Sequence, residues 1–142
     1  MRSIITKSYA KINISLVVEG KREDGYHLLD GVMVPIELHD SIVITELYNG
    51  KDNMISVDDF SEASIEYNVA SVAINKLSEK YGFKNKFRIL IHKVIPIKAG
   101  LGGGSSNAAF TMKAVCNLLK LPYERDVLID IASTLGADVP FF

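Results

Sequence analysis

The stretch HKVIPIKAGLGGGSSNAAF, residues 92–110, places four glycines within five positions and two serines directly after them. It joins the apolar run FRILIHKVIP, which predicts a strand that Pro96 helps to end, to a helical pattern. The first turn of a helix leaves backbone N–H groups unpaired, and the helix dipole attracts anions. Glycines let a phosphate approach such groups closely. We therefore predict a phosphate-binding loop formed by Gly100, Leu101, Gly102, Gly103, Gly104, Ser105 and Ser106.

Three familiar phosphate-binding patterns do not fit this loop. The P-loop requires a lysine after its spacer, where this chain has Ser105 and Ser106. The dinucleotide pattern G-x-G-x-x-G, counted from Gly100, meets Ser105 at its last position, and the protein-kinase loop fails there too. A simple tight turn that brings a helix close to a sheet stays as the alternative, although it requires neither four glycines nor two serines.

Three helices are predicted from apolar residues that recur with a helical period. The helix after the loop begins near Ser105 or Ser106, and its buried face comprises Ala108, Ala109, Met112, Val115, Cys116 and Leu119. An earlier helix ends at Gly82, and its buried face comprises Ile65, Val69, Val72, Ala73 and Leu77. A third helix has Gly136 as its C-cap, and its buried face comprises Leu128, Ile131, Ala132 and Leu135.

Alternating apolar residues near the N-terminus predict a half-buried strand, because successive side chains of a strand point to opposite faces. The apolar face comprises Ile12, Ile14, Leu16 and Val18, and the opposite face comprises Lys11, Asn13 and Ser15. Further along the chain we predict a turn, two strands and a loop, over residues 20–25, 32–36, 41–47 and 48–63 respectively. Strands followed by helices that one more strand interrupts predict an α+β fold, and no linker divides residues 1–142.

The composition suits one globular domain, since 48% of the 142 residues are hydrophobic and the net charge is −1. A pI near 6.3 argues against a nucleic-acid partner. The single cysteine, Cys116, excludes an intramolecular disulfide. No segment predicts a membrane span or a signal peptide, so we expect a cytoplasmic protein without a membrane partner. His39 and His92 have no second ligand at metal spacing, so no metal ligand is assigned, and no pattern specifies an oligomeric state.

The glycine-rich stretch PIKAGLGGGSSNAA resembles the corresponding motif of the GHMP kinases. Three more stretches, YAKINISL, REDGYHLLDGVM and LGADVPFF, are similar to those of the subgroup that acts on 4-diphosphocytidyl-2-C-methyl-D-erythritol. The resemblance implies an ATP-binding domain over residues 1–142, with a ribosomal protein S5 domain 2-like fold and a left-handed βαβ crossover. It also implies a C-terminal domain that this chain lacks. The last residues, GADVPFF, read as the opening of a strand, and for this reason too we expect a longer protein.

The implied activity is transfer of the γ-phosphate of ATP to the 2-hydroxyl of this substrate, in non-mevalonate isoprenoid biosynthesis. Asp138 resembles the general base of the family, and Lys11 resembles the lysine that stabilises the transferring phosphoryl group. Asn13 projects from the same strand face as Lys11 and is assigned to substrate binding. Taken alone, a turn aspartate and a solvated lysine would explain Asp138 and Lys11 equally well.

The resemblance assigns further binding roles. Lys93 and Asn68 correspond to residues that line the adenine pocket, and Tyr26 and His27 to a pair that recognises cytidine by stacking and hydrogen bonding. Mg²⁺ is expected with ATP, held by phosphates, water and a serine hydroxyl such as Ser106. The alternatives are another GHMP kinase with a different alcohol substrate, and a catalytically silent binding domain of the same fold.

Overall fold

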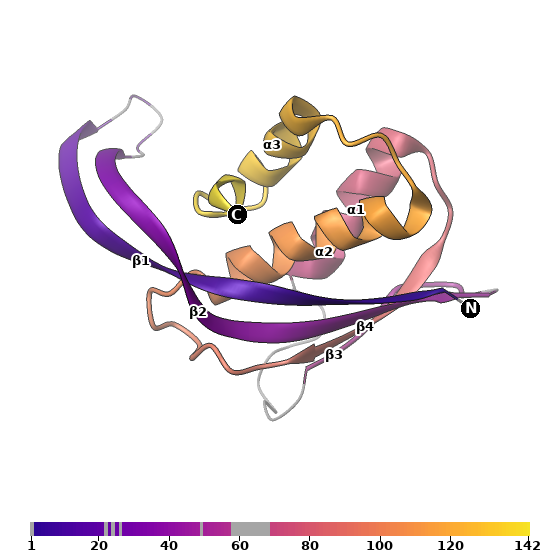
Figure 1. Cartoon of the computed structure of the whole chain (residues 1–142). Helices are drawn as coiled ribbons and strands as arrows, with labels where there is room; N and C mark the ends of the chain where they lie inside the picture. Colours follow the sequence, from indigo (N-terminus) through magenta and orange to yellow (C-terminus); the bar gives the residue numbers. More distant parts are fainter. Residues whose placement is uncertain (1, 22, 24, 26, 49, 58–68) are drawn as a thin grey trace.

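The computed structural model describes residues 2–21, 23, 25, 27–48, 50–57 and 69–142, and for residues 27–29 it describes the backbone. In this part of the chain, one sheet carries helices on one of its faces (Figure 1). The elements, in chain order, are β1 (Ser3–Lys21), β2 (His27–Leu47), β3 (Met54–Val57), α1 (Val69–Tyr81), β4 (Lys86–His92), α2 (Gly103–Leu119), α3 (Arg125–Ser133) and the 3₁₀ helix η2 (Val139–Phe141).

The sheet is mixed, and its strands lie in the order β1-β2-β4-β3. β2 runs antiparallel to both β1 and β4, whereas β3 pairs with β4 in parallel. The register of the three strands can be followed from Ile89 of β4, which is opposite Ile44 of β2 on one side and Ile55 of β3 on the other. A parallel pair needs a crossover connection, and α1 supplies it between β3 and β4. This arrangement confirms the predicted α+β class.

The core lies between the sheet and the helices α1 and α2. Every second residue is buried along β4 and along residues 40–46 of β2, as expected for a sheet covered on one face. Each fully buried aliphatic side chain of this kind contributes about 1.5–3 kcal/mol relative to an exposed one. The largest fully buried apolar side chains are Phe87, Ile42, Ile44, Ile74, Leu77, Ile89, Ile91, Ile95, Val115 and Val139.

The paired strands β1 and β2 extend well beyond the helices and form a curved arm (Figure 1). Every β1 residue from Ile12 to Glu19 is exposed, and Ile14 and Leu16 are 65% and 53% accessible. The prediction of a half-buried strand with its isoleucines inward is therefore wrong. The alternation is present in the sequence, but this arm reaches past the helices that cover the rest of the sheet, so its apolar residues stay exposed.

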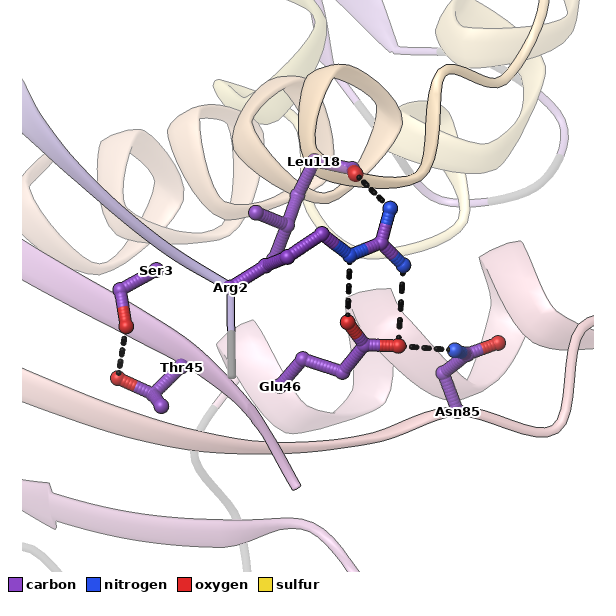
Figure 2. A network of polar contacts seen from close by, with 6 residues as sticks. All are labelled: Arg2, Ser3, Thr45, Glu46, Asn85 and Leu118. Atoms are coloured by element: carbon purple, nitrogen blue, oxygen red, sulfur yellow. Dashed lines mark hydrogen bonds and ion pairs between the residues drawn. The ribbon is translucent and has the colours of Figure 1, made fainter. Parts of the chain in front are cut away.

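A polar network joins the other end of β1 to β2 and α2 (Figure 2). The Arg2 guanidinium donates to both carboxylate oxygens of Glu46, at 2.7 and 3.1 Å, and to the Leu118 carbonyl at 2.9 Å. Asn85, just before β4, donates to the same carboxylate. The Arg2 guanidinium is the main reason why the pKa of Glu46 lies below its usual range. Glu46 thus links the end of α2 to the strand ends beneath it.

Several predicted boundaries among the strands were wrong. Residues 32–36 and 41–47 belong to one continuous strand, β2, which a register shift divides opposite Tyr9 and Ala10. β3 lies within residues 48–63, which were predicted as loop. A four-residue strand gives little periodic signal, and its pairing with β4 involves partners far away in the sequence. β4 ends at His92, ahead of the position where Pro96 was expected to end it.

The helices agree better with their predictions. α1 ends as expected, because Gly82 adopts φ 72° and its N–H bonds the Ser78 carbonyl at 2.8 Å. Of its predicted buried face, Val72 is exposed and Ile65 lies outside the described residues. None of the described helices is long and apolar enough to cross a membrane.

The C-terminal part of the chain differs from its predictions at three points. α2 begins at Gly103, earlier than the predicted serines. α3 ends at Ser133 with Thr134 as its C-cap, so Gly136 does not cap it. Residues of the expected last strand instead form η2, and Pro140 fits the first turn of this helix because it has no N–H group to leave unpaired.

Candidate functional site

Lys11 and Asp138 form the centre of the candidate site. Lys11 lies on β1, and its side chain is only 5% exposed, whereas Asp138 precedes η2 and is 37% exposed. The Lys11 ammonium is 3.2 Å from Asp138 Oδ2 and donates to Asn13 Oδ1 at 3.2 Å. A buried lysine is costly without such partners. The structure therefore brings together the two residues assigned to catalysis and one assigned to the substrate.

Lys11 lies beside a register shift in the pairing of β1 with β2. The pairing with β2 slips between Tyr9 and Ala10, and both Ala10 and Lys11 are buried. The two extra residues at this shift, Glu37 and Leu38, belong to β2, and such irregularities are common beside functional sites. Strict alternation along β1 does not account for the burial of two successive residues, Ala10 and Lys11.

The glycine loop lies directly beside Lys11. The Lys11 N–H donates to the Leu101 carbonyl at 3.0 Å, which ties the loop to β1. Gly102 adopts φ 70°, and a Cβ there would lie 3.0 Å from Cγ of Lys11 and 3.1 Å from the Phe142 ring. Both the backbone conformation and the close approach require glycine at this position. Gly100 also has a positive φ, 74°.

The loop leads into the N-terminus of α2, which carries unpaired donors. The first helical bond runs from the Ser106 N–H to the Gly102 carbonyl, at 2.8 Å. The N–H groups of Gly103, Gly104 and Ser105 therefore have no acceptor within the helix. A Cβ at Gly104 would meet nothing within 4 Å, so the space next to this residue is open. Together with the positive end of the helix dipole, these donors fit an anionic group.

Behind the loop, the structure shows a polar contact that the sequence did not reveal. Ser8 Oγ on β1 is 2.8 Å from Ser106 Oγ and 2.7 Å from Asn107 Oδ1, and all three residues are buried. An amide oxygen only accepts, so the single hydroxyl proton of Ser8 is donated to Asn107. The Ser106 hydroxyl is then the donor in its contact with Ser8. Of the two loop serines, Ser105 alone keeps partial exposure.

Lys93 and Asp40 form a second ion pair near the loop. The Lys93 ammonium is 2.5 Å from Asp40 Oδ2, and their side chains are 7% and 0% exposed. Asp40 Oδ1 accepts the N–H groups of Val94 and Ile95 at 2.7 and 2.8 Å, which explains why β4 ends at His92. Asp40 was not predicted, although its position two residues before Ile42 places it on the inward face of β2.

Two of the remaining predicted site residues, Tyr26 and Asn68, lie outside the described residues. His27 begins β2 and pairs with Lys21 through the backbone, and its side chain is outside the description. His39 packs against the Tyr9 ring, with a centroid distance of 5.5 Å. Within the described ranges, no group of three or more histidines, cysteines and carboxylates is arranged to hold a metal ion.

Comparison with known proteins supports the resemblance noted from the motifs. The GHMP kinases N terminal domain family matches residues 68–142, just over half of the chain. A protein from Alkaliphilus oremlandii, named 4-diphosphocytidyl-2-C-methyl-D-erythritol kinase, is 40% identical over 141 residues. These cover 99% of this chain and 48% of that protein. The chain thus spans about half the length of the curated relatives that it matches.

Solved structures agree with this result. The crystal structure of a 4-(cytidine 5'-diphospho)-2C-methyl-D-erythritol kinase matches with a TM-score of 0.77 and 36% identity, over 98% of this chain and 48% of that one. Homoserine kinase from Cytophaga hutchinsonii matches with a TM-score of 0.69 and 19% identity, over 94% and 40% of the two chains, which shows a shared fold alone. The chain therefore belongs to the GHMP kinase family, whose N-terminal domain it carries.

Proposed function

We propose that this chain is the ATP-binding part of a kinase that phosphorylates the 2-hydroxyl of 4-diphosphocytidyl-2-C-methyl-D-erythritol, in non-mevalonate isoprenoid biosynthesis. The observation that carries the proposal is the Lys11–Asp138 pair, 3.2 Å apart, beside a glycine loop whose last N–H groups have no acceptor within α2. The names of the relatives at 36–42% identity support this substrate over that of another GHMP kinase.

Phosphoryl transfer requires alignment of a hydroxyl with the γ-phosphorus, a base for its proton and compensation of the phosphate charge. Asp138 is the proposed base, since its carboxylate is partly exposed and reachable by a substrate hydroxyl. Lys11, held beside it, compensates the charge that develops on the transferring group. β1 holds Lys11 and η2 begins directly after Asp138, so little reorganisation of the two side chains is needed for the reaction.

The glycine loop is the proposed binding site for the ATP phosphates. Open space above Gly104 and donors at the start of α2 fit this role. Mg²⁺, when bound with ATP, would neutralise part of the phosphate charge. Ser106 is buried against Ser8, so phosphates, water and the more exposed Ser105 suit the metal better than Ser106 does. Lys93 and Asn68 stay predicted contributors to the adenine pocket, although the Lys93 ammonium is already paired with Asp40.

The substrate side of the site is proposed to include Asn13, Tyr26 and His27. Asn13 is exposed and contacts the Lys11 ammonium, so a hydroxyl placed at Asp138 would also lie near Asn13. Tyr26 and His27 are expected to recognise cytidine.

We further propose an S5 domain 2-like fold, in which β3, α1 and β4 form the left-handed crossover. We also propose a C-terminal domain in the complete protein and a cytoplasmic location. A crystal structure at the full length of the relatives would test the fold.

The direct test uses Asp138→Asn and Lys11→Met in a protein of the relatives' full length that carries this chain. Substrate-dependent ADP release should fall by about 10²–10⁴-fold in Asp138→Asn, which is typical of a lost general base. Asp130→Asn, at an exposed carboxylate of α3, is the matched control and should retain wild-type turnover. Wild-type turnover in Asp138→Asn would contradict the proposed mechanism.

Two more outcomes separate the alternative functions. Competition by cytidine nucleotides is expected for the proposed substrate and not for a kinase that acts on another alcohol. Absence of ATP binding by the full-length protein would instead favour a catalytically silent domain. Binding is measured by titration with ATP and Mg²⁺, independently of turnover.

A further inference from the structure

Ser8 and Asp40 are buried polar residues in the sheet beneath the glycine loop. They are opposite each other in the β1–β2 pairing, and both are 0% exposed. Residues that are directly opposite in an antiparallel pair point to the same face. A buried polar side chain is unfavourable unless its hydrogen bonds are satisfied. The partners that satisfy these two residues lie at the two ends of the glycine loop.

Asp40 holds the segment that enters the loop. Its carboxylate accepts the Val94 and Ile95 N–H groups and pairs with Lys93, as described above. The side chains of Ile95 and Lys93 in turn lie directly against Gly103. A Cβ at Gly103 would lie 3.0 Å from Ile95 Cγ2 and 3.1 Å from the Lys93 ammonium. One carboxylate therefore determines how the chain approaches the first residue of α2.

Ser8 holds the segment that leaves the loop. Its hydroxyl contacts the side chains of Ser106 and Asn107, which belong to the first turns of α2. These contacts hold the N-terminal end of α2 against β1, three residues before Lys11. The first N–H groups of α2 are thus held in place by contacts that start from the Ser8–Asp40 position of the sheet.

We propose that Ser8 and Asp40 are positioning residues that hold the two ends of the glycine loop in place and thereby set its affinity for the phosphates of ATP. The effect on ATP rests on the function proposed above, whereas the effect on the loop itself does not. Both residues are fully buried, so no direct contact with the phosphates is assigned to them. They act through Lys93, Val94 and Ile95 on one side and through Ser106 and Asn107 on the other. Binding by preorganised donors weakens when the donors lose their fixed positions.

The test compares three variants in the full-length protein. Asp40→Asn retains an acceptor oxygen but removes the charge that Lys93 needs, and Ser8→Ala removes a single hydroxyl. Glu46→Gln is the matched control, because Glu46 is a buried carboxylate on the same strand and face that pairs with Arg2 away from the loop. Ser8→Ala is the smallest change, so it keeps the proposal testable if Asp40→Asn fails to fold.

Two readouts are measured for each variant. We expect KM for ATP to rise about 10-fold or more in Asp40→Asn and Ser8→Ala, by analogy with the loss seen when the outer partners of metal ligands are removed. KM for the alcohol substrate should stay near its wild-type value. Without nucleotide, hydrogen exchange should accelerate selectively in residues 94–106. Glu46→Gln should change neither KM for ATP nor the exchange of this segment.

The outcomes distinguish a positioning role from a general loss of stability. If Asp40→Asn and Ser8→Ala affect KM for ATP and exchange in residues 94–106 no more than Glu46→Gln does, the proposal is wrong. Equal acceleration of exchange throughout the sheet and helices would also overturn it. Because exchange is measured without nucleotide, selective acceleration would support the positioning role even if the wild-type protein proved not to transfer phosphate.

Discussion

Gly102 and Gly104 are two residues apart and differ in why the chain has glycine there. At Gly102 the positive φ and the close approach of Lys11 leave no room for a side chain. At Gly104 a Cβ would meet nothing within 4 Å, and the residue lies in the first turn of α2. The fold does not need glycine at position 104. A ligand bound in the open space next to Gly104 would need it, because a side chain would occupy that space.

Gly104→Ala should therefore separate stability from binding. Alanine is the better helix former by up to about 1 kcal/mol, so the unfolding midpoint should stay equal or rise. ATP affinity should fall, because the new methyl group occupies the space assigned to the phosphates. Thermal unfolding and ATP titration of the same sample measure both quantities.

Gly102→Ala serves as the comparison for this experiment. It should lower both stability and ATP affinity, since strain and contact with Lys11 both arise. If Gly104→Ala binds ATP as tightly as the wild type does, the phosphates do not occupy the space above Gly104.

Among the structural elements, the network around Glu46 links β1, β2 and α2 through one carboxylate. Hydrogen bonding to Arg2 is the largest cause that lowers the pKa of Glu46 below its usual range. A lowered folded-state pKa stabilises the fold above the unfolded pKa, near 4.3. This contribution disappears as the pH falls through the folded-state pKa.

Glu46→Gln should accordingly lower the urea midpoint at pH 7, and the difference from wild type should shrink below about pH 4. The Arg2 guanidinium stays protonated throughout, so the titration belongs to the carboxylate. Urea unfolding of both proteins between pH 7 and pH 3 measures the effect. A difference that stays constant over this range would show that the carboxylate charge contributes nothing.

The exposed arm and the covered sheet belong to the same strands, yet shortening a side chain should affect stability differently in the two parts. Ile44 on β2 is 0% exposed beneath the helices, whereas Ile14 on β1 is 65% exposed. In this chain, Ile44→Ala should cost about 2–5 kcal/mol of unfolding free energy. Ile14→Ala should change the unfolding free energy by no more than about 0.5 kcal/mol.

Urea unfolding of the 142-residue chain checks both values. Equal costs for Ile14→Ala and Ile44→Ala would mean that the arm packs against something in solution. Glu19→Ala, at an exposed position of β1 in the same arm, is the control for changes in the arm that remove no apolar group.

For the molecule as a whole, Cys116 offers a probe of cooperative unfolding. It lies in α2 at the centre of the core and is 2% exposed. Burial raises the pKa of this thiol to about 11. A buried thiol that is almost entirely protonated at neutral pH is a poor nucleophile.

Modification of Cys116 by a thiol reagent at pH 8 should therefore be slow in the folded chain and limited by opening of the core. The same reaction in 8 M urea is the reference and should be fast. Mass spectrometry of samples taken over time measures both rates. Equally rapid modification in the two conditions would show that α2 does not stay packed on the sheet.

The positions of most elements followed from local patterns. A helical period, a glycine in the left-handed conformation at position 82 and a glycine-rich segment between strand and helix are all encoded in neighbouring residues. The candidate pair of Lys11 and Asp138 came from motif resemblance, and the structure places the two side chains together. The catalytic roles themselves stay predictions until the variants are measured.

Long-range packing determined what the sequence alone did not reveal. Alternation predicted two faces for the N-terminal strand, but which face is buried depends on where the helices end and where the register with β2 slips. β3 depends on its pairing with β4, and the roles of Ser8 and Asp40 depend on partners about 100 and 55 residues further along the chain. Local periodicity is written in consecutive side chains, whereas burial is a property of the surfaces that meet after folding. The sequence by itself therefore specified most of the elements and predicted a phosphate site at the glycine loop, and the folded arrangement determined the contacts beneath that loop and the exposure of the arm.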